Sequence, residues 1–97
     1  MRLVWTRRAR IDLREAISYV AEDNPDAADR LENTILASAR RLPSHPEMGR
    51  PGRVAGTREL VVAGTRYLIP YRVREGRVEL LAVIHGARQW PQSFGEP

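Results

Sequence analysis

The spacing of apolar residues changes half-way along this chain, and the change restricts the folds that it can adopt. Before Pro43, apolar residues recur every three or four positions, as they do along one side of an amphipathic helix. After Gly56, they alternate with polar residues in three runs, which is the pattern of half-buried strands. With 97 residues and no cysteine, the sequence predicts one α+β domain over residues 1–97, held by a single core and without disulfides.

Two helices are predicted in the first half of the chain. The first spans about residues 7–22 and follows Thr6, a good N-cap residue. The second follows Asn24 as N-cap, has Pro25 at its first position and extends to about residue 42. Because only two or three residues join them, the helices must lie antiparallel as a hairpin. Their apolar sides are formed by Ala9, Leu13, Ala16, Ile17, Val20 and Ala21 and by Ala28, Leu31, Ile35, Ala39 and Leu42.

Four strands are predicted outside the hairpin. A short strand covers Leu3–Trp5, and three longer strands cover Thr57–Val62, Arg66–Arg74 and Arg77–His85. The last two are joined by Glu75-Gly76, which is short enough for a tight turn. The expected order is therefore β-α-α-β-β-β, with the antiparallel helical hairpin packed on a mostly antiparallel sheet.

The alternation within the last two strands predicts which side chains face the hairpin. The apolar sides are formed by Tyr67, Ile69, Tyr71 and Val73 in one strand and by Val78, Leu80, Ala82 and Ile84 in the other. We therefore expect the opposite side to present Arg66, Arg72 and His85 to solvent or to a partner. Pro70 cannot donate a backbone hydrogen bond, so a bulge or an exposed edge is expected beside it.

The segment between the two halves, residues 43–56, is rich in proline and glycine and is predicted to be a loop. Arg50 and Arg53 lie in this loop, and Arg58 follows it. Each can meet the carboxylates of a partner or a phosphate backbone. We expect at least one of them to be held instead by Glu59, by Glu32 or by loop carbonyls.

All sixteen basic residues are arginine, and acidic residues balance them unevenly. Residues 1–48 carry eight arginines and eight acids, whereas residues 49–97 carry eight arginines and four acids. The positive second half favours an anionic partner, either a nucleic acid or an acidic polypeptide. Arginine stays protonated and cannot act as a base, so any proton abstraction falls to His, Glu, Asp or Tyr.

The sequence carries no sign of a membrane segment, an export signal or a cofactor site. The longest apolar run, Leu80–Ile84, has five residues, whereas a membrane span needs about 20. Arg7, Arg8 and Arg10 occupy the place where a signal peptide would be apolar. With no cysteine and two histidines, no metal site is expected. We expect a cytoplasmic protein without metal or cofactor, ending in a loose tail over residues 89–97.

Several short motifs stand out when they are taken together. They are Ala9-x-x-x-Leu13-x-x-x-Ile17-x-Tyr19, Asn24-Pro25-x-Ala27-Ala28, Gly49-Arg50-x-Gly52-Arg53, Gly56-Thr57-Arg58-Glu59-Leu60, Tyr67-Leu68-Ile69-Pro70-Tyr71-Arg72-Val73 and Val83-Ile84-His85. In this order they resemble the RelE/ParE superfamily of toxins from bacterial type II toxin-antitoxin systems. The resemblance covers nearly the whole chain. It implies an acidic antitoxin, normally encoded alongside, whose extended helical segment wraps the toxin in a hetero-oligomer.

The motif at residues 56–60, with the arginine-rich loop before it, looks more like ParE-type members of the superfamily. This resemblance implies a toxin that binds and inhibits DNA gyrase, serves plasmid stabilisation and performs no chemistry of its own. Arginine and tryptophan are the side chains most enriched at binding hot spots, so they are the candidates for such a surface. The candidate partner-binding or phosphate-binding residues are Arg50, Arg53, Arg58, Arg66, Arg72, Arg88 and Trp90.

A RelE-like ribosome-dependent mRNA endonuclease is the alternative interpretation. Cleavage through the RNA 2′-hydroxyl needs a base, an acid and cations around the phosphate. Glu47 can be the base and His85 the acid, while Arg66 clamps the phosphate together with Arg58 or Arg72. Against this hypothesis, the chain has no lysine and no tyrosine beyond residue 71, where the family's enzymes often place one. A non-toxic binding domain derived from this fold is the third interpretation.

Overall fold

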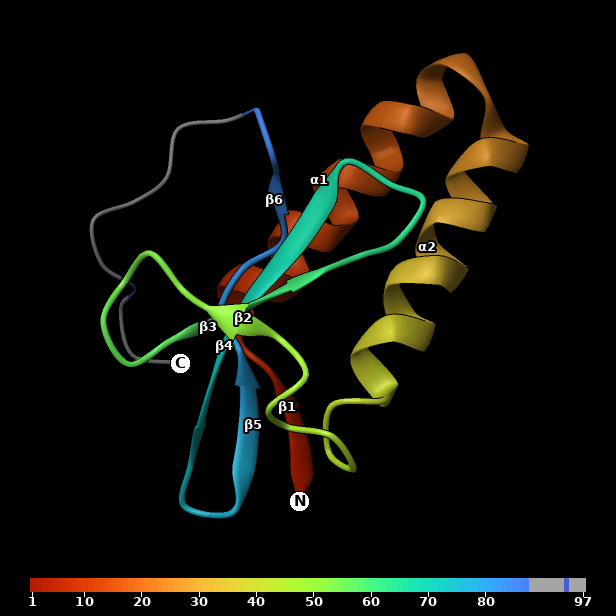
Figure 1. Cartoon of the computed structure of the whole chain (residues 1–97). Helices are drawn as coiled ribbons and strands as arrows, with labels where there is room; N and C mark the ends of the chain where they lie inside the picture. Colours follow the sequence, from red (N-terminus) through yellow and green to blue (C-terminus); the bar gives the residue numbers. More distant parts are fainter. Residues whose placement is uncertain (88–93, 95–97) are drawn as a thin grey trace.

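The computed structural model, which describes residues 1–87 and 94, places a helical hairpin on one face of a mixed sheet (Figure 1). This arrangement confirms the predicted α+β class. It adds a two-residue strand inside the predicted loop and divides the predicted last strand in two. The elements are β1 (Arg2–Trp5), α1 (Arg7–Asp23), α2 (Pro25–Arg40), β2 (Arg50–Pro51), β3 (Arg58–Val61), β4 (Tyr67–Arg74), β5 (Arg77–Leu80) and β6 (Ile84–His85).

The two helices begin at the residues that the sequence predicts, because each has a side-chain cap. The Thr6 hydroxyl oxygen accepts a hydrogen bond from the Ala9 N–H at 3.2 Å, and Asn24 Oδ1 accepts one from the Ala27 N–H at 3.0 Å. The backbone N–H of Asn24 also donates to the carbonyl of Val20, so one residue ends α1 and starts α2. In the part of the chain that the structure describes, no helix is long and apolar enough to cross a membrane.

The sheet has the strand order β1-β5-β4-β3-β2, with β6 paired to the start of β4. The pairing of β1 with β5 is parallel, and all the other pairs are antiparallel. Between β4 and β5, Glu75 and Gly76 have φ values of 54° and 72°, so both occupy the left-handed region. Two such residues form the mirror-image type of turn that matches the twist of a hairpin, as expected for this connection.

A bulge interrupts the pairing of β4 beside Pro70. Tyr71 pairs with Leu80 and Leu68 pairs with Ile84, so two residues of β4 oppose three on the other strand. The N–H of Leu81 donates to the Pro70 carbonyl at 2.8 Å, while proline itself has no N–H to return. The expectation of a bulge at Pro70 is therefore confirmed, and the bulge ends β5 at Leu80.

The bulge also corrects one prediction about the faces of the sheet. Because one extra residue shifts the alternation, Val83 joins the core between hairpin and sheet, whereas Ala82 and Ile84 pack with Leu68 in a separate cluster. The prediction that Ala82 and Ile84 continue the apolar side of Leu80 is wrong. We call the side of the sheet that packs on α1 and α2 the hairpin face, and the other side the opposite face.

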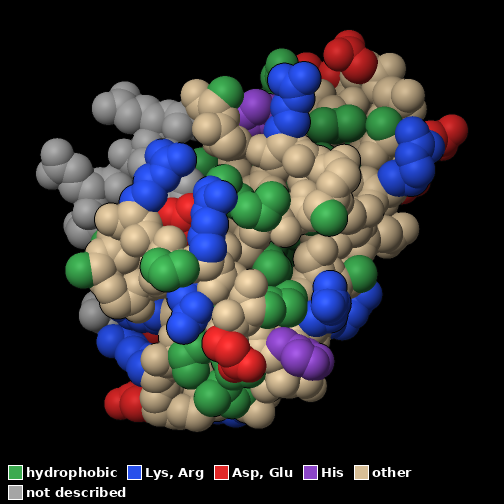
Figure 2. Space-filling model, in the orientation of Figure 1, with side chains coloured by type: hydrophobic (Ala, Val, Ile, Leu, Met, Phe, Trp, Pro, Cys, Tyr) green, Lys and Arg blue, Asp and Glu red, His purple; other side chains and the backbone are tan. Residues whose placement is uncertain are grey.

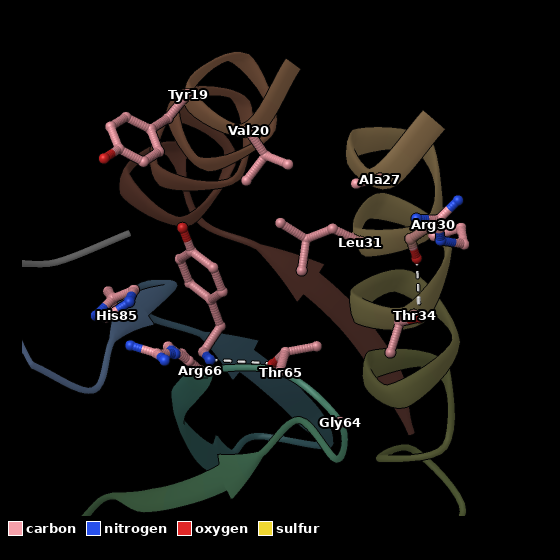
Figure 3. Close-up of a pocket in the computed structure, with 11 residues that line it drawn as sticks. Tyr19, Val20, Ala27, Arg30, Leu31, Thr34, Gly64, Thr65, Arg66 and His85 are labelled. Carbon is pink, nitrogen blue, oxygen red and sulfur yellow. Dashed lines mark hydrogen bonds between the residues drawn. The ribbon is translucent and has the colours of Figure 1, made fainter. Parts of the chain in front are cut away.

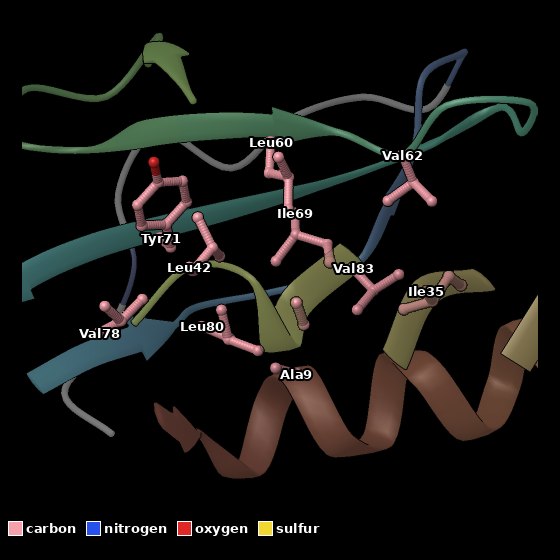
Figure 4. Close-up of a cluster of buried hydrophobic side chains, with 11 residues drawn as sticks. Ala9, Ile35, Leu42, Leu60, Val62, Ile69, Tyr71, Val78, Leu80 and Val83 are labelled. Carbon is pink, nitrogen blue, oxygen red and sulfur yellow. The ribbon is translucent and has the colours of Figure 1, made fainter. Parts of the chain in front are cut away.

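The main core lies between the hairpin and the hairpin face of the sheet (Figure 4). Both layers supply fully buried aliphatic side chains, each of which stabilises the fold by about 1.5–3 kcal/mol relative to exposure to water. Its members are Ala9, Ile35, Ala39, Leu42, Leu60, Val62, Ile69, Tyr71, Val78, Leu80 and Val83.

Tyr71 carries the polar group of this core and fixes the long loop before β2. Its hydroxyl donates to the Pro46 carbonyl at 2.7 Å and accepts from the Gly49 N–H at 2.9 Å. A Cβ atom on residue 49 would lie 2.6 Å from the tyrosine ring, so only glycine fits there. Burial raises the pKa of the Tyr71 hydroxyl, against the smaller opposing effects of the Gly49 N–H and of Arg58, so the hydroxyl stays a donor at neutral pH.

Replacement of Tyr71 by phenylalanine tests this loop anchor. Tyr71→Phe removes both hydrogen bonds and leaves the Pro46 carbonyl and the Gly49 N–H without the hydroxyl. We expect a loss of about 1–3 kcal/mol in the free energy of unfolding, measured by urea denaturation. Tyr19→Phe is the matched control, because Tyr19 is 67% exposed and its loss should change stability by less than about 0.5 kcal/mol. Equal effects of the two substitutions would contradict the anchoring role.

Candidate functional site

A cleft of about 510 Å³ opens between the hairpin and the β3–β4 connection, and we call it the hairpin cleft (Figure 3). Its inner surface is apolar: Val20 extends into it from α1 and Leu31 extends from α2. Tyr67 closes the sheet side, and Tyr19 stands at the α1 edge with 67% of its surface exposed. Apolar clefts with few polar groups at the rim are typical of binding sites.

The charged groups at the rim of the hairpin cleft are arginines, and a histidine lies beside one of them. Arg30 lies on the α2 side, whereas Arg66 and His85 lie on the sheet side (Figure 3). None of the described residues that line the cleft is acidic. The cleft therefore combines an apolar interior with a positive rim, which suits a ligand that carries an apolar group beside a negative charge.

The position of His85 follows from the register of β6. His85 pairs with Tyr67, and the two rings meet edge to face with their centroids 5.3 Å apart and their planes at 86°. The Nδ1 atom of His85 accepts a hydrogen bond from the Ala87 N–H at 3.2 Å. These contacts hold the imidazole on the hairpin face of the sheet, at the edge of the cleft.

The loop arginines gather around Glu59, a buried carboxylate on β3 that is only 2% exposed. Arg50 Nε donates to Glu59 Oε1 at 3.1 Å, and the backbone N–H of Arg53 donates to Oε2 at 2.8 Å. The Arg53 side chain adds a longer contact of 4.0 Å. Arg58 points to the loop instead, where Nη1 donates to the Gly49 carbonyl at 2.8 Å. The expectation that the fold holds at least one of these arginines is confirmed.

A second buried carboxylate, Glu79 on β5, organises the arginines of the hairpin between β4 and β5. Its oxygens lie 2.7 Å from Arg72, 3.0 Å from Arg74 and 3.1 Å from Arg77. Burial alone would raise the pKa of Glu79, but the hydrogen bond from Arg72 and the charges of all three arginines outweigh it. The net result is a pKa below the ordinary value, so Glu79 is ionised and balances part of the surrounding positive charge.

The structure separates the residues that were expected to share one solvent-facing side of the sheet. Arg72 pairs with Glu79 on the opposite face, whereas His85 lies on the hairpin face, because the bulge shifts the alternation between them. That prediction is therefore wrong. Figure 2 shows arginine side chains spread over the visible surface among hydrophobic and acidic ones. Of the candidate binding residues, Arg66 lines the cleft, and Arg88 and Trp90 lie outside the described residues.

The candidate catalytic residues lie in two places. Arg58 Nη1 contacts the Glu47 carbonyl at 3.3 Å, so Glu47 belongs to the loop that Tyr71 anchors. His85 lies beside Tyr67. Tyr67 precedes Tyr71 by four positions, which corresponds to about 13 Å along β4. Arg66 accompanies His85 in the cleft. The backbone segments that carry Glu47 and His85 therefore lie beside different parts of β4.

The sequence does not indicate a site role for the cleft residues on the helices, which are Tyr19, Val20, Ala27, Arg30, Leu31 and Thr34. Its apolar spacing predicts Val20 and Leu31 only as core-facing residues of the hairpin. The available signal is the exposure of Tyr19 next to the apolar stripe of α1, since a large aromatic residue at such a boundary is typical of a binding edge. The opposite wall of the cleft, formed by the sheet, depends on how the hairpin packs on the sheet. This packing cannot be predicted from the spacing of residues in the sequence.

Comparison with known proteins identifies the family. Residues 3–90 match the family described as the ParE toxin of the type II toxin-antitoxin system parDE. The chain belongs to the ParE toxin family. As the toxin of such a system, it has an antitoxin as its partner.

Relatives of this ParE-family toxin carry both ParE and RelE names. Y4kP of Sinorhizobium fredii is 46% identical over 91 residues, which cover 94% of each chain. Toxin RelE2 of Caulobacter vibrioides is 38% identical and covers 89% of this chain and 96% of its own. Toxin ParE2 of Mycobacterium tuberculosis is 36% identical, with 84% of this chain and 83% of its own covered.

The fold agrees with that of a solved toxin-antitoxin complex. A chain from the structure titled "Chromosomal ParDE TA system from P. aeruginosa" superposes with a TM-score of 0.81 and 26% identity. The match covers 88% of this toxin and 95% of that chain. The RelE/ParE fold that the motifs imply is therefore confirmed.

The Glu79 cluster gives a pH-dependent prediction for this ParE-family toxin. Glu79→Gln leaves three arginines without their carboxylate, so we expect a loss of about 2 kcal/mol in the free energy of unfolding at pH 7. Because the folded pKa is depressed, the wild-type advantage should be complete above the ordinary value of 4.5 and disappear as the pH falls through the folded pKa.

Denaturant unfolding of both proteins between pH 7 and pH 2 measures this difference. The control is Glu75→Gln, because Glu75 is 74% exposed and pairs with Arg77 at the surface. It should cost less than about 0.5 kcal/mol at every pH. A Glu79→Gln penalty that stays constant down to pH 2 would show that the carboxylate charge is not what stabilises the cluster.

Proposed function

We propose that this toxin inhibits DNA gyrase by binding to it and performs no chemistry of its own. The observation that carries this proposal is the placement of the two residues that the sequence suggests for RNA cleavage. Glu47 belongs to the loop that contacts Tyr71, whereas His85 pairs with Tyr67, four residues earlier on β4. The match to the ParE family supports the same proposal. A toxin that acts by binding needs a surface rather than a set of reacting groups, and this chain has surfaces on both sides of its hairpin.

RNA cleavage through the 2′-hydroxyl sets a strict geometric requirement. The base must reach the hydroxyl proton and the acid must reach the leaving oxygen of the same phosphate, each within about 3 Å. Tyr71 bonds to Pro46 and Gly49, on either side of Glu47, whereas Tyr67 contacts His85, and the two tyrosines are about 13 Å apart along β4. The loop that carries Glu47 is fixed by Tyr71 and Arg58. For both groups to act on one phosphate, the side chains of Glu47 and His85 would have to span this distance.

Two other functions are distinguished from gyrase inhibition by the expression experiment described below. The relative named RelE2 keeps the mRNA endonuclease as an alternative, in which Arg66 and His85 bind the RNA phosphate in the hairpin cleft. A non-toxic binding domain is the other alternative. Both predict different consequences in a cell that produces the protein.

The partner of the hairpin cleft is, in this proposal, an acidic segment of the antitoxin. Such a segment would place an apolar side chain against Val20 and Leu31 and carboxylates beside Arg30 and Arg66. The absence of acidic groups among the described residues that line the cleft supports this assignment, because the charged groups at the rim, Arg30 and Arg66, both attract carboxylates. We expect the protein to act in the cytoplasm, as a hetero-oligomer with its antitoxin before release.

Expression of the toxin in a bacterial host distinguishes these functions. We expect growth arrest with DNA breaks and a damage response, inhibition of supercoiling when purified toxin is added to gyrase, and intact translated messages. Glu47→Gln and His85→Gln should arrest growth as strongly as the wild type, because neither residue reacts. Circular dichroism and thermal melting of each variant confirm that it is folded.

Cleavage of translated mRNA that either substitution abolishes would contradict the proposal and establish the nuclease. Normal growth of the host, with gyrase from the same species unaffected in vitro, would favour the non-toxic binding domain.

Removal of charge from the cleft rim tests where the antitoxin binds. Arg30→Gln and Arg66→Gln should each weaken antitoxin binding about tenfold and reduce its salt dependence, as measured by isothermal titration. Arg7→Glu is the control, because Arg7 is an exposed residue of the first turn of α1, where an acid is favourable. It should leave the affinity unchanged. Equal weakening by all three substitutions would indicate general charge attraction rather than the cleft.

A further inference from the structure

A second hollow, which we call the outer groove, lies between α1 and α2 and has a volume of about 360 Å³. Its floor is apolar and consists of Trp5, Leu13, Ile17 and Leu36, all of them only partly buried. Positions 32 and 36 of α2 point about half a turn away from positions 27, 30, 31 and 34, which line the hairpin cleft. The outer groove and the cleft therefore open on opposite sides of α2.

The two rims of the outer groove have opposite charges. Arg10 and Arg14 stand on the α1 side, and Glu32 stands on the α2 side. Within the described chain, none of these three residues takes part in an ion pair. The groove thus differs from the hairpin cleft, whose rim is basic only. An acidic segment would meet attraction at one rim and repulsion at the other.

The opposite charges also lie at almost the same height on the hairpin. The chain reverses at Asn24, and Arg14 lies ten residues before it while Glu32 lies eight residues after it. With a rise of about 1.5 Å per residue, the two side chains start within about 3 Å of the same level along the groove. They face each other across the apolar floor.

This arrangement is complementary to itself. A two-fold axis parallel to the groove places α1 of one copy over α2 of a second copy, and α2 over α1. Arg14 of each copy then meets Glu32 of the other, and the apolar floors meet between these two ion pairs. Contacts that occur twice in this way are the mark of an isologous dimer interface. We propose that the outer groove is the surface through which two copies of this toxin associate.

The expected dimer is a reversible one. Helices of 17 and 16 residues are about 25 Å long, so two facing hairpins form an interface at the small end of the specific range. Trp5 lies in the floor of the groove, and tryptophan is the residue most often found at the energetic centre of such contacts. The proposal concerns the toxin alone and does not depend on its target.

Sedimentation equilibrium of the purified full chain and of charge variants tests the proposal. The wild type should change from monomer to dimer as its concentration rises to about 100 μM, which corresponds to micromolar affinity. Arg14→Glu and Glu32→Arg should each lower the dimer affinity at least about tenfold, because each places like charges opposite one another. The double variant restores opposite charges and should recover most of the affinity. Arg30→Glu, on the other side of α2, should dimerise as the wild type does.

Three results would overturn the proposal. They are a wild type that stays monomeric at about 100 μM, single variants that dimerise as well as the wild type, and a double variant that does not regain the dimer. A monomeric wild type whose antitoxin binding is weakened by Arg14→Glu would assign the groove to the antitoxin instead. Circular dichroism of each variant shows that the helices are intact, so loss of the dimer is not loss of the fold.

Discussion

The missing N–H of Pro70 determines which side of the sheet carries each polar group of this toxin. A proline in a middle strand leaves one position of the ladder without a donor, and the neighbouring strand accommodates it with one extra residue. That residue reverses the alternation after Leu80. Val83 and His85 are thereby brought to the hairpin face, where His85 meets Tyr67 and the cleft acquires its polar edge. Without the bulge, His85 would lie on the side of Glu79 and its arginines.

Five of the sixteen arginines of the chain lie around its two buried carboxylates. Burying a carboxylate is costly unless several hydrogen bonds and charges replace the lost water, and Glu59 and Glu79 each have more than one arginine as a neighbour. These arginines neutralise the buried carboxylates and thereby stabilise the fold itself. The positive charge that remains at the hairpin cleft belongs to Arg30 and Arg66, one from each layer. Net charge alone does not distinguish these two groups.

The parts of this fold that the sequence predicts are those that depend on neighbours in the chain. Thr6, Asn24 and the Glu75-Gly76 turn act within three or four residues, so the helices and the β-hairpin begin and end close to the predicted positions. The face of His85 was predicted wrongly because a one-residue bulge cannot be located from alternation. The cleft could not be predicted either, since Arg30 and Arg66 are 36 positions apart and meet only through the packing of hairpin on sheet.

The helical hairpin carries two hollows whose rims differ in charge. The hairpin cleft has Arg30 and Arg66 at its rim and no acid among its described lining residues, so its rim favours an acidic chain. The outer groove has Arg14 and Glu32 on facing rims, so an acidic chain is attracted by one rim and repelled by the other. A second copy avoids this conflict because its charges are reversed by the two-fold axis. Since the two surfaces lie on opposite sides of α2, the proposed binding of antitoxin in the cleft and the proposed pairing of toxins through the groove use different parts of the hairpin.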